Sequence, residues 1–301
     1  MIRQISAIFD TQALGYDSSL VAAKVTPAQL VAAAEAINAH PGVSHNYQRD
    51  HAYNLWFTVA VPRGSRLGLS GTVEHLAAAS GAAAMRLMPT LRLFKIGVKL
   101  DLAGAGGAGE QDDAVEYGPA DRAQAERYAL DESDRRLVRV LQQDLALSRD
   151  PFDAWARQMG VSVAELLASG RRLEQRRQMR RFAAVLRHRS AGFAANAMGV
   201  WAVADDRVEA VGRQLAGFKA VSHCYQRPTY DDWPYNLFTM VHARTRADCE
   251  AELAAMAEAT GVTWRAALYS VRQFKKTRVR YFTGEIEAWE AQGARPPEAV
   301  G

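Results

Sequence analysis

The stretch Ser44-His45-Asn46-Tyr47-Gln48-Arg49, followed by Tyr53-Asn54-Leu55, decides how this chain folds, because it occurs twice. The second copy reads Ser222-His223-Cys224-Tyr225-Gln226-Arg227 and continues, after a longer loop, with Tyr235-Asn236-Leu237. A repeated fold needs a repeated apolar pattern, but it has no general need to repeat an imidazole, a phenol and a guanidinium. The recurrence therefore indicates a duplicated domain that carries a duplicated site.

The repeat extends beyond these motifs on both sides. Gly81 matches Gly261, and the segment 92–95 (Arg-Leu-Phe-Lys) matches 272–275 (Arg-Gln-Phe-Lys). Upstream, Gly15-Tyr16 matches Gly192-Phe193. The copies therefore cover roughly residues 3–100 and 180–282, and each has the size of one small domain.

In each copy, the apolar pattern predicts the order strand, helix, strand, strand, helix, strand. The first copy is expected to have strands at 18–25, 43–49, 53–61 and 84–97, with helices beginning at Thr26-Pro27 and spanning 70–80. The second is expected to have strands at 197–203, 221–227, 235–242 and 264–275, with helices at 206–215 and 245–260. This order predicts an α+β fold with two ferredoxin-like βαββαβ sandwiches.

A different element separates the copies. Residues 103–127 are rich in Gly, Ala and acid, which predicts a flexible linker. Residues 104–109 match the glycine pattern of dinucleotide sites, but the acidic run at 110–113 would repel phosphate there. Residues 131–178 then read as helices capped by Asp131 and Ser162, with a turn at Gly160, which is typical of a helix-turn-helix.

These patterns divide the chain into five parts. We expect a first ferredoxin-like domain, a linker, a helix-turn-helix domain, a second ferredoxin-like domain and a tail, at residues 1–102, 103–127, 128–178, 179–285 and 286–301.

A run of arginines ends the predicted helix-turn-helix: Arg171, Arg172, Arg176, Arg177, Arg180 and Arg181. Such a run can contact DNA phosphates, form a solvated basic face, or provide a basic wall for another anion. No second helix-turn-helix precedes residue 3, where the repeat would require one, and a symmetric DNA reader needs two. We therefore expect no specific DNA partner.

Composition excludes several classes of protein. The chain has 301 residues and a net charge of +4, from 37 basic and 33 acidic residues, which suits an anionic small-molecule ligand. No apolar run approaches the roughly 20 residues of a membrane span, and the first residues do not resemble a signal peptide, so we expect a cytoplasmic protein that does not enter a membrane. Two cysteines, Cys224 and Cys249, do not suggest a disulfide framework.

A helix-turn-helix followed by a ferredoxin-like sandwich resembles the Lrp/AsnC family of regulators. The segment 45–49 (His-Asn-Tyr-Gln-Arg) with 53–56 (Tyr-Asn-Leu-Trp), together with 7–10 (Ala-Ile-Phe-Asp) and 14–16 (Leu-Gly-Tyr), resembles one branch of that superfamily, the siroheme decarboxylases. The resemblance implies a fused form of a two-subunit carboxy-lyase that makes 12,18-didecarboxysiroheme, an intermediate toward heme d1 and, in some organisms, heme. The second copy departs from the pattern, with Cys224 in place of Asn46 and an inserted loop at 228–234.

Side chains two residues apart on a strand share a face, so each motif should present its histidine, tyrosine and arginine together. A siroheme site needs cations for the carboxylates and apolar walls for the ring. We therefore expect these catalytic residues: His45, Tyr47, His223 and Tyr225. We expect these substrate-binding residues: Arg49, Tyr53, Trp56, Arg92, Lys95, Arg227, Tyr235, Arg272 and Lys275.

The expected chemistry assigns one role to each residue type. A histidine would donate a proton after decarboxylation, with His45 preferred because its neighbours match the family pattern better. Arginine and lysine would bind carboxylates, and no cofactor is expected beyond the iron of siroheme, to which His45 or His223 could alternatively be an axial ligand. No protein metal site is expected, because the remaining histidines show no ligand spacing.

Two other functions remain open from the residues. The chain could be an Lrp/AsnC-type transcriptional regulator or a non-catalytic tetrapyrrole-binding protein. We expect the two repeats to pair face to face within one chain, because each sheet must cover its open face. A homodimer or partner enzymes of the same pathway are further expected contacts.

Overall fold

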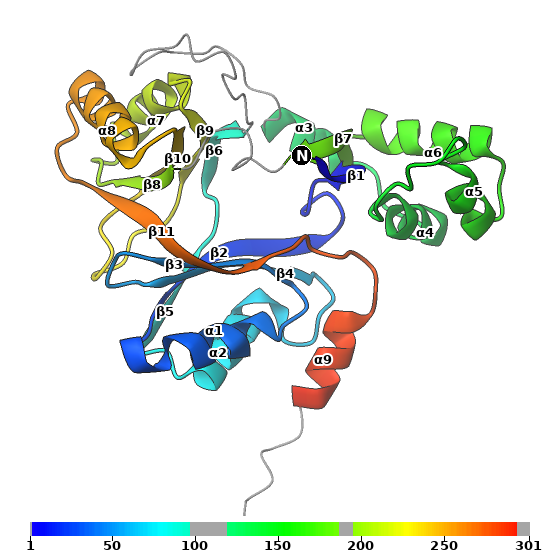
Figure 1. The fold of residues 1–301 in the computed structure, drawn as a ribbon, viewed down its shortest axis with the longest axis horizontal. Helices are drawn as coiled ribbons and strands as arrows, with labels where there is room; N and C mark the ends of the chain where they lie inside the picture. Colours follow the sequence, from blue (N-terminus) through cyan, green and yellow to red (C-terminus); the bar gives the residue numbers. More distant parts are fainter. Residues whose placement is uncertain (1, 97–118, 187–194, 294–301) are drawn as a thin grey trace, which may run out of the picture.

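The computed structural model describes residues 2–96, 119–186 and 195–293. Each copy of the repeat forms a four-stranded antiparallel sheet with two helices on one face (Figure 1). The first copy consists of β2 (Tyr16–Lys24), η1 (Pro27–Gln29), α1 (Leu30–Asn38), β3 (Val43–Arg49), β4 (Leu55–Pro62), α2 (Gly68–Ser80) and β5 (Ala84–Met88). The second consists of β8 (Ala195–Trp201), α7 (Val208–Gly217), β9 (Val221–Gln226), β10 (Leu237–Ala243), α8 (Arg246–Thr260) and β11 (Arg265–Lys276).

The strand orders are β5-β2-β4-β3 and β11-β8-β10-β9, so the two copies have the same ferredoxin-like topology. This confirms the predicted fold class. Local signals ended the helices as expected, since Gly81 and Gly261 both adopt the left-handed conformation directly after α2 and α8. Thr26 precedes the first helical turn, as the threonine of a capping motif would, but its hydroxyl donates to the Gln29 side chain and does not cap the backbone.

The chain builds three apolar cores from the two sheets. One lies between the first sheet and α1 and α2, and a second lies between the second sheet and α7 and α8. The third lies between the open faces of both sheets and includes Trp56 and Met88 from the first copy and Val200, Phe238 and Leu268 from the second. The predicted face-to-face pairing of the repeats is therefore confirmed.

Strand exchange reinforces this pairing. The first half of β11 pairs with β8, and its second half pairs with β3 of the first copy. In return, β6 (Arg92–Ile96) of the first copy pairs with β9 of the second. Hydrogen bonds thus join nine strands into one sheet, in which β11 crosses between the two lobes (Figure 1).

The single strand predicted at 84–97 is wrong, because β5 and β6 are separate strands. Pro89 lies between them and has no N–H to donate to a sheet. At the equivalent place in the second copy, the N–H of Tyr269 donates to the Asp50 carboxylate at 2.6 Å, and β11 continues without a break. The segment that pairs with the other copy is therefore a separate strand, β6, in the first copy and the second half of one continuous strand, β11, in the second.

Gly212 on α7 makes room for the exchanged arm. A Cβ at Gly212 would lie 2.4 Å from the ring of Phe94 on β6, which is closer than real contacts allow. We expect Gly212→Ala to destabilise the protein by about 1–3 kcal/mol, because the ring or the arm must shift. The control is Gly71→Ala on α2, where the nearest atom is an ordinary 3.5 Å away and alanine favours the helix.

Urea denaturation followed by far-UV circular dichroism measures the free energy of unfolding of both variants. Equal midpoints for Gly212→Ala and Gly71→Ala would show that β6 does not depend on this close contact.

The predicted helix-turn-helix is present as α4 (Glu132–Leu141), α5 (Asp153–Met159) and α6 (Val163–Gln175). Asp131 caps α4 by accepting from the N–H of Asp134 at 2.7 Å, and Ser162 forms a capping box with Glu165. The segment predicted as a linker contains one further helix, α3 (Pro119–Ala125). The glycine pattern at 104–109 and the Gly192-Phe193 match lie outside the described residues.

An N-terminal strand that the sequence analysis missed lies beside this domain. β1 (Ile2–Phe9) pairs with β7 (Met179–Leu186) in a separate two-stranded sheet. Ala7 and Phe9 of β1 share a core with Leu137 and Leu166 of the helix-turn-helix. The start of the chain therefore packs against the helix-turn-helix domain and not in the first sandwich.

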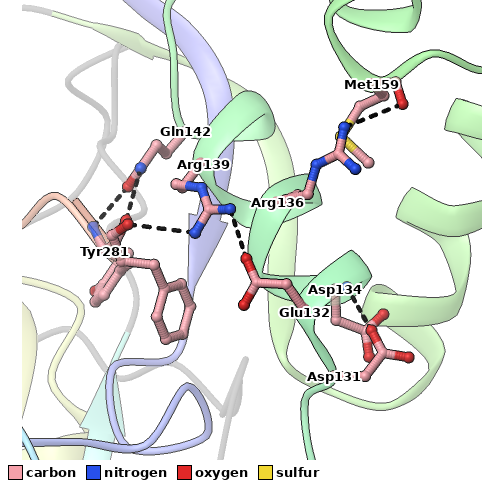
Figure 2. Close-up of polar contacts among 9 residues, drawn as sticks. Asp131, Glu132, Asp134, Arg136, Arg139, Gln142, Met159 and Tyr281 are labelled. Carbon is pink, nitrogen blue, oxygen red and sulfur yellow. Dashed lines mark hydrogen bonds and ion pairs between the residues drawn. The ribbon is translucent and has the colours of Figure 1, made fainter. Parts of the chain in front are cut away.

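The helix-turn-helix is also joined to the segment that follows β11. The Gln142 side chain donates to the Tyr281 carbonyl at 3.1 Å and accepts from the Tyr281 N–H at 2.8 Å (Figure 2). Arg139 bridges the same segment and the helix, since it donates to the Phe282 carbonyl and to Glu132. These contacts fix the domain relative to the paired sandwiches.

The predicted tail at 286–301 is partly helical, because α9 (Glu285–Gly293) continues into it. The Glu290 carboxylate accepts from the backbone N–H groups of Arg66 and Leu67, and the Trp289 ring meets His40 edge-on at 4.4 Å. α9 thus packs against the first sandwich (Figure 1). Within the described ranges, no helix is both long and apolar enough to cross a membrane.

Candidate functional site

The two His-Tyr-Arg motifs line the space between the sheets. Tyr47 lies opposite Trp56 in the β3–β4 ladder, and Tyr225 lies opposite Phe238 in the β9–β10 ladder. Trp56 and Phe238 both belong to the core between the sheets. Residues on the opposite face point toward the helices: Asn46 donates to Asn38 of α1. The predicted shared face of each motif is therefore present.

In each motif, the histidine at the start of the strand is partly accessible to solvent, and the arginine at its end is buried. His45 and His223 are half-buried, and each ring lies nearly parallel to the next tyrosine ring, with centroid distances of 6.2 and 6.0 Å. The arginines at the inner ends are buried. Each imidazole thus lies at the accessible end of an aromatic wall.

Arg49 and Arg227 hold the two copies together. Arg49 donates to the Leu268 carbonyl of the second copy at 2.8 Å, and Arg227 donates to the Met88 carbonyl of the first. Burial lowers the pKa of both guanidinium groups to about 10, which leaves them charged at neutral pH. Their expected role in gripping substrate is not supported by this placement, since 6% and 8% exposure leaves little surface for a carboxylate.

A serine hydroxyl orients each histidine. In the first copy, Ser44 Oγ lies 3.1 Å from Nδ1 of His45 and 2.8 Å from the hydroxyl of Thr58. In the second, Ser222 Oγ lies 2.7 Å from Nδ1 of His223 and 2.8 Å from Nε2 of His242. The sequence analysis missed both serines, although each directly precedes its histidine.

Burial, together with the smaller effect of the positive charges of His242, Arg180 and Arg227, lowers the pKa of His223 to about 3. His223 is therefore a neutral imidazole at neutral pH. Arg180 comes from β7 and belongs to the arginine run for which a basic wall for an anion was one of three interpretations. Arg180 is one of the positive charges that lower the pKa of His223, after burial and the charge of His242.

Four of the cations that were expected to bind substrate lie on the helix-covered faces of the sheets. Lys95 donates to the Phe218 carbonyl after α7, and Lys275 donates to the Asn38 carbonyl at the end of α1. Both ammonium groups thus lie at the C-terminus of a helix, where the helix dipole favours a positive charge. Arg92 pairs with Glu209 of α7 at 2.5 Å. Arg272 lies over the ring of Phe274, which packs on the first helix-side core.

Bulges turn the two lysines, which were expected to bind substrate, toward the helices. The ladder between β6 and β9 shifts register between Leu93 and Lys95, and that between β11 and β3 shifts between Gln273 and Lys275. A bulge adds one residue and turns the following side chains to the other face. The lysines therefore point away from the two motifs.

Tyr53, Trp56 and Tyr235 surround Trp233, which the inserted loop of the second copy carries into the core between the sheets. The neighbouring Asp232 accepts from the Tyr53 hydroxyl at 2.6 Å and pairs with Arg86 at 3.2 Å. Burial and the Asp232 bond raise the pKa of Tyr53 to about 12, so it remains a phenol. These aromatic side chains pack between the two copies and stabilise their pairing. Trp56 is 1% exposed and therefore belongs to this core.

A cavity of about 470 Å³ lies elsewhere, at the junction of the β1–β2 turn and the helix-turn-helix, where Leu14, Arg63 and Arg135 line it. Neither motif histidine borders it. Within residues 2–96, 119–186 and 195–293, no three His, Cys, Asp or Glu side chains are grouped as metal ligands. The expectation of no cofactor beyond a substrate iron stays a prediction.

Part of the arginine run is engaged inside the protein. Arg176 pairs with Asp134 of α4 at 3.3 Å, and Arg177 pairs with Asp121 of α3 at 3.1 Å. Both pairs fasten neighbouring helices to the end of α6. The absence of a specific DNA partner stays a prediction.

Two family models match the chain. Residues 13–95 and 190–275 match an AsnC-like ligand-binding domain, and residues 134–180 match a siroheme decarboxylase NirDL-like helix-turn-helix domain. The first match covers both sandwiches, and the second covers the domain between them.

Relatives match over most of the chain. A siroheme decarboxylase of Hydrogenobacter thermophilus is 41% identical over 96% of this chain and 84% of its own length. A siroheme decarboxylase NirDL subunit of Paracoccus denitrificans is 35% identical over 86% of this chain and 77% of its own length. A crystal structure of a siroheme decarboxylase NirDL superposes with a TM-score of 0.74 at 35% identity, over 97% of this chain and 83% of that one.

Proposed function

Because the chain belongs to the siroheme decarboxylase family, we propose that it removes the carboxyl groups of the C12 and C18 acetates of siroheme to give 12,18-didecarboxysiroheme. The observation that carries this proposal is the pair of His-Tyr rows on the facing sheets. A related NirDL structure, similar to this chain with a TM-score of 0.73, holds an iron-uroporphyrin III analogue, which supports a tetrapyrrole ligand here.

Each decarboxylation breaks the bond between an acetate methylene and its carboxylate. Carbon dioxide leaves, the electron pair stays on the methylene carbon and spreads into the macrocycle, and one proton completes a methyl group. The protein must therefore bind the other carboxylates, shield the reacting one from water and deliver one proton for each carbon dioxide lost.

We place the proton donor at a motif histidine, with the adjacent Tyr47 or Tyr225 ring as a wall for the macrocycle. His223 is favoured over His45 here, because its serine lies closer and also contacts a second imidazole, that of His242. Arg180 is our candidate for a carboxylate contact at this site, in place of the buried arginines of the motifs. The iron of siroheme is substrate in this scheme.

Anaerobic incubation of the purified protein with siroheme tests the proposal by mass spectrometry. The expected product has lost two molecules of carbon dioxide, and the same incubation without protein should leave siroheme unchanged. Siroheme that is bound but keeps its mass would instead identify a non-catalytic tetrapyrrole-binding protein.

A further inference from the structure

The second sandwich contains a continuous row of three proton-carrying side chains. Ser222 Oγ lies between the two imidazoles, 2.7 Å from Nδ1 of His223 and 2.8 Å from Nε2 of His242. Ser222 is buried at 4% exposure, whereas both histidines are half-buried. A hydroxyl donates one hydrogen bond and accepts others, so it can pass a proton from one imidazole to the next.

Building on the decarboxylase function proposed above, we propose that His242 and Ser222 supply, through His223, the proton that completes each methyl group. His223 is the catalytic residue of this relay, and Ser222 and His242 are positioning and proton-supplying residues behind it. The relay is a property of the second sandwich.

The proton path balances without any other reactant. His242 starts as an imidazolium with a proton on each ring nitrogen, and His223 starts neutral with its proton on Nε2. When Nε2 of His223 gives its proton to the substrate carbon, Nδ1 takes the hydroxyl proton of Ser222, and Ser222 takes the proton from Nε2 of His242. One proton leaves His242, one reaches the carbon, and His223 stays neutral but ends with its proton on Nδ1. Proton exchange of the half-buried His223 and His242 with solvent restores the starting protonation before the next transfer.

The surroundings of His223 make such a relay necessary. The charged or titratable groups that act on its pKa come from three strands: His242 from β10, Arg180 from β7 and Arg227 from its own strand β9. Together with burial they keep the imidazole neutral, and a neutral imidazole is a weak acid on its own. A concerted transfer solves this difficulty, because the donor is resupplied as it gives up its proton.

In the described part of the first sandwich, the serine before the motif histidine contacts a threonine hydroxyl in place of a second imidazole. There, Ser44 bonds the Thr58 hydroxyl, and Thr58 lies opposite His45 as Met240 lies opposite His223. The residue two places after Thr58 is Ala60, whereas the residue two places after Met240 is His242. Ser222 is also 3.3 Å from the Met240 carbonyl, but this contact is longer than its bonds to the imidazoles.

The test measures anaerobic single-turnover loss of carbon dioxide from siroheme across a range of pH, together with siroheme affinity. Ser222→Ala and His242→Gln should slow the reaction by about tenfold to a hundredfold with affinity unchanged, and Ser222→Thr, which keeps the hydroxyl, should restore most of the rate. Since the relay needs protonated His242, the parental rate should fall as pH rises, and the rate of His242→Gln should be low and flat.

The matched control is Ser270→Ala, which removes another partly buried strand hydroxyl, bonded to Asn196 at 3.2 Å and outside the relay. It should keep the parental rate and pH profile. Parental rates for Ser222→Ala and His242→Gln would overturn the relay while leaving the decarboxylase function intact, and so would a Ser222→Thr variant as slow as Ser222→Ala. A parental protein that leaves siroheme unchanged would instead contradict the proposed function itself.

Discussion

Replacing His223 by alanine is expected to slow carbon dioxide loss from siroheme by about a hundredfold or more, which is the usual contribution of a general acid. The same change at His45 is expected to slow it by less than about tenfold, since Ser44 connects that imidazole to the Thr58 hydroxyl, which does not ionise at neutral pH. Anaerobic single-turnover assays of both single variants and the double variant measure the effect.

The siroheme affinity of each variant, measured by absorbance titration, separates lost chemistry from lost binding. His223→Ala should keep its affinity within about threefold, since the imidazole acts on the transition state. A slow His45→Ala with a normal His223→Ala would move the donor to the first copy. A double variant with the parental rate would exclude both histidines.

Replacing Trp233 by alanine is expected to cost about 3–5 kcal/mol of stability, the usual loss for a large aromatic side chain removed from a core. The side chain is fully buried between the sheets and contacts the rings of Tyr53, Trp56 and Phe238. The first copy has no tryptophan that matches Trp233, because its motif is followed by the short segment 50–52 and not by the inserted loop at 228–234.

Thermal unfolding followed by far-UV circular dichroism measures the unfolding midpoint of Trp233→Ala, with Trp264→Ala as the control. Trp264 is 61% exposed, so its replacement should change the midpoint little. A midpoint for Trp233→Ala within about 1 °C of the parent would show that the inserted loop does not hold the two sandwiches together.

The local signals in the sequence were sufficient for the order of elements. Glycine at 81 and 261 ended helices through a left-handed turn, and Asp131 and Ser162 began helices through side-chain caps. These effects depend on a few adjacent residues, so they can be read without the fold. The repeat of the His-Tyr-Arg motif likewise predicted two equivalent rows on facing sheets.

The site was predicted only in part, because alternation holds only within an unbroken ladder. His45 and Tyr47 share their face as expected, whereas the bulges before Lys95 and Lys275 turned both lysines to the helices. The buried contacts of Arg49 with the other copy depend on strand pairing between residues more than 200 positions apart.

The sequence by itself determined the duplication, the ferredoxin-like order of each copy and the helix-turn-helix between them, because apolar periodicity and helix caps act over a few residues. Only the tertiary structure decided which strands exchange, that β1 joins β7, and that Arg180 and His242 gather around His223. Those contacts join distant segments whose partners are selected by packing and backbone hydrogen bonding of the whole fold, and no local pattern encodes them.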